Sequence, residues 1–241
     1  MPSAPTVLET LSKQDVPEEF DRIASGYDRL SAMNPGYQKH LEWSARRLPV
    51  PSGGRILDLC CGTGLSTLGV RRAHPTARIT GLDASRGMLE YASRKQELQG
   101  VTWLQGDAMD PRVGGAQGPF DAILMAYGIR NVPDPDTCLQ RLLELLQPGG
   151  TLCLHEYSVA DSLRSRVTWN MVTFGVVIPL GFMVTRSSRI FRYLRRSVLD
   201  FDGAERLQER MRQAGFTDVH TEPMDGWQRG VVHSFLGRRP A

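Results

Sequence analysis

The sequence predicts an α/β fold with a doubly wound parallel sheet and helices on both faces. Three observations support this prediction. Short apolar stretches typical of buried strands alternate with helical patterns over most of the chain. The first of these strands runs directly into a glycine-rich turn and then into a helix. The chain has 241 residues, 41% of them apolar, which is enough for one α/β domain and too few for two typical domains.

The elements follow in a regular order. Strands are expected at residues 55–59, 78–83, 102–105, 120–125, 151–157, 217–222 and 231–236. Helices are expected before, between and after them, among them 18–25, 36–48 and 203–214. The clearest helix has Asp134 as its N-cap and Pro135 in its first position, and the Gln-Pro-Gly-Gly sequence at 147–150 ends it.

The glycine turn indicates a nucleoside site. Gly62 and Gly64 lack a Cβ, so the backbone can turn tightly and approach a ligand, while the next helix directs free N–H groups at it. Asp83 ends the second strand roughly 20 residues later, where a ribose-binding carboxylate is expected. The alternative is that Asp83 only caps the following helix.

The residues around the turn select the kind of ligand. No phosphate-binding lysine follows the glycines, which argues against an ATP-binding loop. Asp58 beside the turn would repel a pyrophosphate, yet it could hold an ammonium group directly or through water. S-adenosylmethionine meets this demand, because it carries a ribose diol, a sulfonium and an ammonium and has no phosphate.

Two motifs carry a family resemblance. Residues 58–64 have the D-x-x-x-G-x-G form of class I S-adenosylmethionine-dependent methyltransferases. Residues 120–134, with Gly-Ile-Arg-Asn-Val at their centre, resemble the signature of the menaquinone/ubiquinone C-methyltransferase family, and the similarity extends to 146–158 and 20–28. The resemblance implies a Rossmann-like, mostly parallel seven-stranded sheet with an antiparallel last strand, N-terminal helices and a helical lid.

The resemblance also implies a cofactor site for S-adenosylmethionine, with S-adenosylhomocysteine as product. Asp107 would accept a hydrogen bond from the adenine amino group and the Ala108 N–H would meet the ring, although Asp107 could be a turn residue. Met88 would pack on the adenine or belong to the helix core. The full expected set is Tyr27, Asp58, Cys60, Gly62, Thr63, Gly64, Asp83, Ala84, Met88, Asp107, Ala108 and Ala126.

Three residues at the ligand edge of the sheet are catalytic candidates. Arg130 and Asn131 follow the fourth strand; by resemblance, Arg130 would stabilise a phenolate or orient a water, and Asn131 would fix a ring oxygen. Arg130 could instead pair with an acid and hold the loop. His155 ends the fifth strand beside Glu156 and has a pKa suited to a base, but it could equally be a hydrogen-bonded structural residue. No metal is required.

Composition excludes several classes of partner and compartment. The formal charge is +3 with no lysine tract, so nucleic acid is not an expected partner. Four cysteines without C-x-x-C spacing indicate reduced thiols and a cytoplasmic protein: Cys60, Cys61, Cys138 and Cys153. A secretory signal is not expected, because the first 15 residues have no basic start followed by an apolar stretch. A homodimer is left open.

The segment 161–202 departs from the family and by position is the lid over the acceptor. Its apolar run, 167–184, is interrupted by Asn170, Gly175, Pro179 and Gly181, so a membrane span is not predicted. Arginines follow at 186–196. An apolar lid beside basic residues suits an aromatic or lipid-like acceptor and peripheral contact with a membrane surface. The alternative is a buried helix pair with a solvated arginine face.

These observations predict one methyltransferase domain with four parts: an N-terminal helical cap (1–50), a cofactor-binding core (51–160), a substrate lid (161–202) and a C-terminal helix with strands (203–241). The expected reaction is C-methylation of a quinol or related phenolic ring. The alternatives are O- or N-methylation of a specialised metabolite or lipid head group, and a non-catalytic cofactor-binding protein that acts through a partner.

Overall fold

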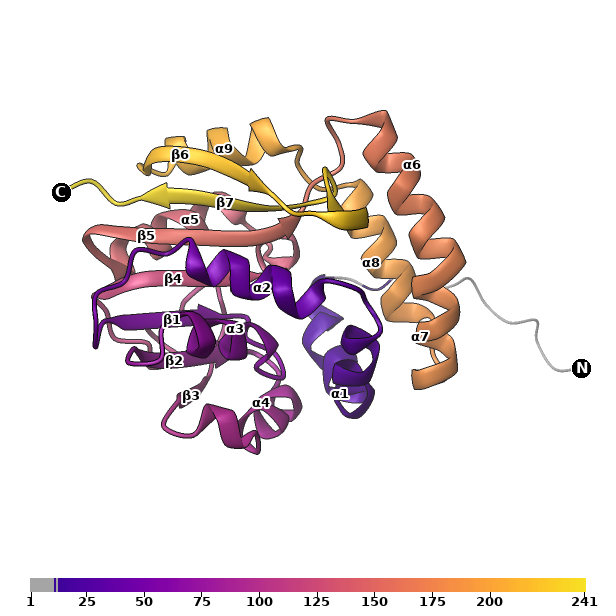
Figure 1. Ribbon diagram of the computed structural model, residues 1–241, viewed down its shortest axis with the longest axis horizontal. Helices are drawn as coiled ribbons and strands as arrows, with labels where there is room; N and C mark the ends of the chain where they lie inside the picture. The colour runs from indigo at the N-terminus through magenta and orange to yellow at the C-terminus, as the bar shows by residue number, and fades with distance from the viewer. Residues whose placement is uncertain (1–10, 12) are drawn as a thin grey trace, which may run out of the picture.

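The computed structural model describes residue 11 and residues 13–241 of the chain. Its centre is a seven-stranded sheet in the order β3-β2-β1-β4-β5-β7-β6 (Figure 1). Only β7 runs antiparallel to its neighbours, which confirms the predicted doubly wound, mostly parallel fold. The strands are β1 (Arg55–Leu59), β2 (Arg78–Asp83), β3 (Thr102–Gln105), β4 (Phe120–Ala126), β5 (Leu146–Tyr157), β6 (Thr217–Pro223) and β7 (Val232–Arg238).

Helices cover both faces of the sheet because successive strand residues point to opposite sides. Leu57 and Leu59 of β1 pack in the cluster that contains α5 (Pro135–Leu145) and α9 (Ala204–Gln213). Ile56 packs in the cluster that contains α2 (Tyr37–Arg46) and α3 (Leu65–Ala73). The strand order reverses between β1 and β4, so the carboxyl ends of these strands flank the crevice where ligands of such sheets bind.

The helix α1 (Val16–Ala32) is longer than the sequence predicted, because Gly26 lies inside it rather than beyond its end. A Cβ at Gly26 would lie 3.0 Å from a methyl carbon of Val184, so glycine permits the close approach of α7 (Ile178–Thr185) to α1. Residues 1–10 and 12 lie outside the described residues. Most of the N-terminal segment for which no secretory signal is expected therefore lies outside them too. The four-part division of the domain stays a prediction.

The lid contains one long helix, which differs from the expectation that polar and glycine residues interrupt it. The helix α6 (Leu163–Val172), a π-helical segment (Thr173–Val177) and α7 run on without a break, over 23 residues. Pro179 falls in the first turn of α7, where a missing N–H is tolerated. By length and composition this helix could cross a membrane. Only 17% of its most apolar window is buried, so the alternative that this helix is buried is wrong, whereas Ile190, Phe191 and Val198 of the next helix are buried.

The remaining lid helix, α8 (Arg189–Leu199), lies between this long helix and the body of the molecule (Figure 1). The strand β5 also differs from its predicted start. It begins at Leu146, directly after α5, and its pairing with β4 shifts register between Phe120 and Ala122. Gly149, in the predicted turn, has a φ of +78°. The predicted turn is therefore an irregular first part of the strand.

Candidate functional site

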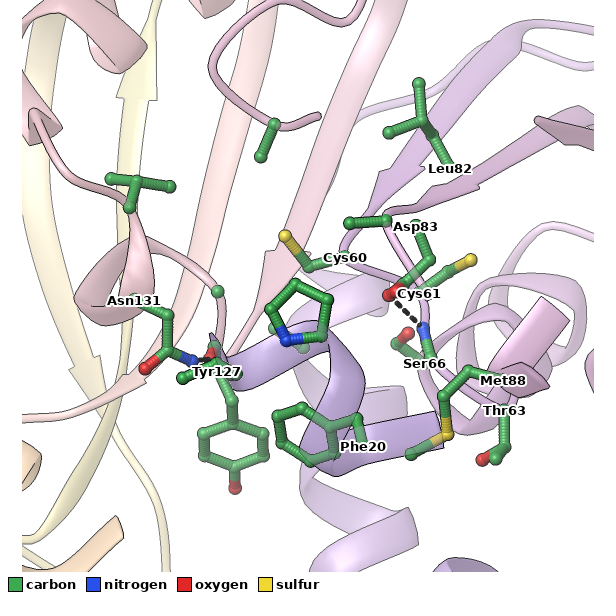
Figure 2. A pocket seen from close by; sticks show the side chains of 18 of the residues that line it. Phe20, Cys60, Cys61, Thr63, Ser66, Leu82, Asp83, Met88, Tyr127 and Asn131 are labelled. Atoms are coloured by element: carbon green, nitrogen blue, oxygen red, sulfur yellow. Dashed lines mark hydrogen bonds between the residues drawn. The ribbon is translucent and has the colours of Figure 1, made fainter. Parts of the chain in front are cut away.

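A cavity of about 380 Å³ lies at the carboxyl ends of β1, β2 and β4 and is closed on one side by α1. Its volume is within the range of small-molecule sites. Figure 2 shows Asp83, Met88 and Thr63 on one side of the cavity, and Tyr127 and Asn131 on the other. One wall thus carries carboxylates from the strand ends, and the opposite wall carries aromatic and amide groups.

The turn between β1 and α3 is held in a backbone conformation that glycine permits. Gly62 and Gly64 have φ values of +54° and +83°, and Cys60 has a φ of +58°. A Cβ at Gly62 would meet nothing within 4 Å, so this residue presents bare backbone to the cavity. A Cβ at Gly64 would lie 2.8 Å from Leu98, so Gly64 serves the packing of the turn.

The carboxylate of Asp83 is oriented by backbone N–H groups. Its Oδ2 accepts from Gly62 at 2.8 Å and its Oδ1 accepts from Ser85 at 2.9 Å. Burial raises the pKa of Asp83, and these N–H groups oppose the rise. The N-cap of α4 (Arg86–Ser93) is Ser85, whose Oγ accepts from Met88 N–H, so capping does not explain Asp83. A carboxylate accepts more than two hydrogen bonds, and capacity remains for ligand hydroxyls.

The remaining groups of this wall suit a ligand with hydroxyls and positive charge. Asp107 follows β3, and its Oδ1 accepts from Met109 N–H at 2.8 Å. Met88 is 1% exposed and contributes an apolar surface. Lys13 is the one basic side chain among the lining residues of the described chain, and its Nζ donates to the Val132 carbonyl. Two carboxylates with so little positive charge would repel a phosphate.

Asp58 lies behind the glycine turn and does not line the cavity. Its Oδ2 accepts from the hydroxyls of Ser66 and Thr67 at 2.8 and 2.6 Å, which fixes the start of α3. Its Oδ1 is buried and has no hydrogen-bond partner in the part of the chain that the structure describes. Burial raises the pKa of Asp58 to about 7. Direct contact with a ligand ammonium is therefore not built into this arrangement.

The helix α1 is tied to the cavity by polar contacts. The hydroxyls of Tyr27 and Tyr37 lie 3.1 Å apart. Thr63, at the glycine turn, donates from Oγ1 to Asp28 of α1, and the same carboxylate forms an ion pair with Lys95 at 2.6 Å. These contacts hold Tyr27 over the cavity and fasten α1 to the glycine turn.

His155 reaches the cavity only through Tyr127. It is 0% exposed, its Nε2 lies 2.9 Å from the Tyr127 hydroxyl, and its Nδ1 lies 2.7 Å from the Ser44 hydroxyl. Burial lowers the pKa of His155 to about 3, and the nearby His40, Arg47 and His233 contribute to the shift. The imidazole is therefore neutral at pH 7. Tyr127 lines the cavity and has a φ of +57°, a strained conformation of the kind that gathers at functional sites.

Arg130 and Asn131 join the strand edge to the lid. The guanidinium of Arg130 forms a buried salt bridge with Glu156 and donates from Nε to the Ser197 hydroxyl of α8 at 3.0 Å. Burial raises the pKa of Glu156, and Arg130 opposes that rise. Asn131 donates to the Tyr127 carbonyl and accepts from the Tyr193 hydroxyl of α8 at 3.1 Å. Asn131 lines the cavity, whereas Arg130 does not.

Most of the predicted residues meet at one cavity. The lining includes Tyr27, Cys60, Gly62, Thr63, Asp83, Ala84, Met88, Asp107, Ala108, Ala126 and Asn131. Four predicted residues lie outside it: Asp58, Gly64, Arg130 and His155. Sequence reasoning missed the aromatic wall of Phe20, Tyr37 and Tyr127. Tyr127 stands in the motif at 120–134 and Phe20 in the similar segment 20–28, so an aromatic residue within these segments was the available signal.

Solved structures have the same fold. One is the [4+2]-cyclase SpnF, with a TM-score of 0.70 and 18% identity, covering 99% of this chain and 100% of that chain. Another is Haemonchus contortus phosphoethanolamine N-methyltransferase 2 in complex with S-adenosyl-L-methionine, with a TM-score of 0.68 and 18% identity, covering 98% and 62%. At these identities the similarity establishes the fold and not the reaction.

The family model described as the ubiE/COQ5 methyltransferase family matches residues 8–238. The chain belongs to the ubiE/COQ5 methyltransferase family. Curated relatives of this chain, two of them from Lactococcus lactis and Geobacillus kaustophilus, are named demethylmenaquinone methyltransferase. That of Lactococcus lactis is 32% identical over 226 residues, covering 91% of this chain and 88% of the relative. That of Geobacillus kaustophilus is 33% identical over 227 residues, covering 90% and 94%.

The ubiE/COQ5 protein described here is thus an S-adenosylmethionine-dependent methyltransferase, as its first two motifs predicted. The alternative of a non-catalytic cofactor-binding protein is set aside. The cavity at the ends of β1, β2 and β4 is the candidate site for this activity, because its lining contains 11 of the 15 predicted site residues.

Proposed function

We propose that this methyltransferase transfers a methyl group to a ring carbon of a quinol that carries a lipid tail. The relatives named demethylmenaquinone methyltransferase support this substrate class. The observation that carries the proposal is the division of one cavity into a carboxylate wall and an aromatic wall. The first wall matches the polar groups of the cofactor, and the second matches a flat aromatic ring.

The carboxylate wall would hold S-adenosylmethionine. Asp83 would accept from the ribose hydroxyls with the acceptor capacity that Gly62 and Ser85 leave free. Asp107 and the Ala108 N–H would bind the adenine edge, and Met88 would cover the adenine face. The remaining contacts would come from Tyr27, Cys60, Gly62, Thr63, Ala84 and Ala126. When bound, this cofactor supplies an electrophilic methyl group.

The aromatic wall would hold and activate the acceptor. Loss of the proton from a quinol hydroxyl places negative charge on the neighbouring ring carbon, so groups that take up that proton or stabilise the resulting negative charge promote methylation. The Asn131 amide lies at the cavity and would bind a ring oxygen. The Tyr127 hydroxyl would be oriented by its hydrogen bond to neutral His155, whose pKa of about 3 makes it too weak a base to take the proton, so His155 is a positioning residue for Tyr127.

Arg130 would act through its neighbours. Its guanidinium is committed to Glu156 and to Ser197 of the lid, and it stands next in sequence to Asn131. We propose that Arg130 positions Asn131 and the lid rather than touching the acceptor. The Asn131 bond to Tyr193 of the same lid helix supports this role.

We also propose a cytoplasmic location at a membrane surface. The four cysteines are free thiols, as in proteins of reducing compartments. A quinol with a lipid tail resides in a bilayer, so its methyltransferase has to meet it there.

Product analysis tests the proposal. The purified protein is incubated with methyl-labelled S-adenosylmethionine and a reduced short-tailed quinone, and the product is fragmented in a mass spectrometer. Label on a ring carbon is the expected result. Label on oxygen, or label that enters only an amine or a soluble metabolite, would overturn C-methylation and favour the O- or N-methyltransferase alternative. Asp83→Ala is the control for a functional cofactor site, and Glu144→Ala, on the exposed side of α5, is its matched control.

A further inference from the structure

The long helix of the lid exposes apolar side chains to solvent. Of the ten large apolar side chains that are exposed in the described part of the chain, seven belong to this helix: Leu163, Val167, Met171, Phe174, Val176, Phe182 and Met183. Their exposed fractions range from 48% for Val167 to 79% for Leu163. In Figure 1, α6 and α7 form an outer edge of the molecule. An apolar stripe of this length on a protein surface indicates an interaction site.

The opposite side of the same helix is buried in the protein. Trp169 and Thr173 are 0% exposed, and Gly181 packs against the ring of Phe191 in α8. Gly26 brings α1 against Val184 near the end of the helix. A helix whose inner side is fixed to its own domain cannot cross a bilayer while the domain stays folded. Its geometry is that of a helix that lies flat on a surface.

The charge of the lid selects the kind of surface. Residues 163–199 contain no Asp, Glu or Lys and seven arginines: Arg164, Arg166, Arg186, Arg189, Arg192, Arg195 and Arg196. This segment therefore carries +7, and since the whole chain carries +3, the remaining residues carry −4. The excess of positive charge and the exposed apolar side chains therefore belong to the same segment. This combination is complementary to an anionic surface that offers hydrocarbon beneath its charges.

Two pairs of arginines show how the charges are distributed. Arg189 and Arg196 are occupied in ion pairs with Glu19 and Asp200. Arg164 and Arg186, at the two ends of the apolar stripe, are exposed and have no acidic partner among the residues that the structure describes. Cations that flank an apolar stripe at both ends can reach head groups while the stripe enters the acyl boundary.

We propose that the outward side of α6 and α7 docks on an anionic lipid bilayer. A second copy of this chain fits less well, because a symmetric contact through this helix would bring two segments of +7 together. The inner side of the helix contributes Val177 and Ile178 to the cluster that contains Phe20 and Tyr27, two cavity residues. The docked helix would therefore share a hydrophobic cluster with side chains that line the acceptor cavity.

The contact itself does not depend on the substrate, although its purpose rests on the proposed quinol methylation. Docking is therefore measured without any quinol. The protein is sedimented with vesicles of phosphatidylcholine alone and with vesicles that also contain phosphatidylglycerol. We expect binding to the anionic vesicles, weaker binding to the neutral ones, and release by high salt. Absence of binding to both kinds of vesicle overturns the proposal.

Matched variants test the two parts of the surface. The double variant Met171→Ser, Phe182→Ser should weaken vesicle binding about tenfold or more, because both side chains would enter the acyl boundary. Val113→Ser is its control, since Val113 is 85% exposed and lies elsewhere. The double variant Arg164→Gln, Arg186→Gln should weaken binding to anionic vesicles roughly tenfold. Arg86→Gln, 79% exposed on α4, is the control for charge. Unchanged binding in both double variants overturns the proposal.

Two further readouts separate the outcomes. Phe182→Trp should shift its emission to the blue on anionic vesicles and be quenched by a lipid-bound quencher, whereas Met33→Trp should not. If the serine variant instead converts a dimer to a monomer in solution, the face is a subunit interface and the lipid proposal is overturned. The docking variants should still methylate a water-soluble quinol at the wild-type rate. A failure of quinol methylation with intact vesicle binding would thus refute the proposed function alone.

Discussion

The guanidinium of Arg130 and the carboxylate of Glu156 form an ion pair that is closed off from water, with side chains 5% and 0% exposed. Glu156→Ala would leave the arginine buried without its counter-charge, so we expect a loss of about 3–5 kcal/mol in the free energy of unfolding. Urea denaturation measures it. The control is Arg86→Ala in an exposed pair with Glu90, where the loss should stay below about 1 kcal/mol. Equal losses in the two variants would contradict the buried role.

The two glycines of the turn should separate stability from ligand binding. Gly64→Ala places a Cβ against Leu98, in a backbone with a φ of +83°, so we expect a loss of roughly 2 kcal/mol or more in stability. Gly62→Ala has room for the Cβ and should unfold only slightly more easily, but the methyl group enters the cavity and should weaken cofactor binding. Gly53→Ala, at φ +72° in open space, measures the backbone strain alone. The reverse pattern, with binding lost only at Gly64, would refute the assignment.

Asp83 should determine cofactor affinity. Asp83→Asn removes the charge and one acceptor, and we expect S-adenosylhomocysteine to bind at least about tenfold more weakly, as a lost charge-assisted hydrogen bond to the ribose predicts. Isothermal titration calorimetry gives the affinity directly. Circular dichroism has to show a folded variant, because Asp83 also binds the Gly62 and Ser85 N–H groups. Unchanged affinity in a folded variant would rule out the ribose contact.

His155 should make stability fall as the solution becomes more acidic. Its pKa is about 3 in the folded protein and about 6.5 when unfolded, so between these values the unfolded chain binds more protons and acid favours unfolding. The loss between pH 7 and pH 5 should be about 2 kcal/mol. His155→Gln removes this contribution. Urea midpoints at the two pH values test it, and a pH profile identical to wild type would contradict the burial of a neutral imidazole.

Asp58 should have the opposite effect over an overlapping range. Its pKa is about 7 when folded and 3.8 when unfolded, so in this interval the folded protein binds more protons and stability falls as pH rises. The wild-type profile then conceals two opposing contributions. We expect His155→Gln to become less stable from pH 5 to pH 7, and Asp58→Asn to become more stable. If both variants change in the same direction, one of the two pKa shifts has the wrong sign.

The first three strands could be predicted from the sequence almost to the residue. The strands β1, β2 and β3 are short apolar runs that end at a glycine turn or an acid, and nothing in their surroundings competes with that pattern. The helix α1 was predicted too short because Gly26 breaks the local helical pattern. The structure shows that glycine is needed there for the tertiary contact with Val184. A glycine that serves packing looks the same in sequence as one that ends a helix.

The site residues also differ in whether local sequence determines their surroundings. Residues whose role is local, such as Gly62 and Asp83, could be assigned to the cavity because a strand end fixes their position. Arg130 follows β4 and His155 lies near the end of β5, but their surroundings come from distant segments, namely Ser197 of the lid and Ser44 of α2. The continuity of the lid helix through Asn170 and Pro179 likewise depends on a π-helical segment that composition does not reveal.

The two bonds from α8 to the strand edge bear on the design of chimeras. Ser197 accepts from Arg130, and Tyr193 donates to Asn131, so each contact pairs a hydroxyl of the lid with a polar group of the GIRNV motif. A lid transplanted from a relative would seat on this core only if it brings hydroxyls to the same two places. A chimera that exchanges residues 161–202 therefore has to keep a hydroxyl at two positions, and the donor sequence shows whether it does before any gene is made.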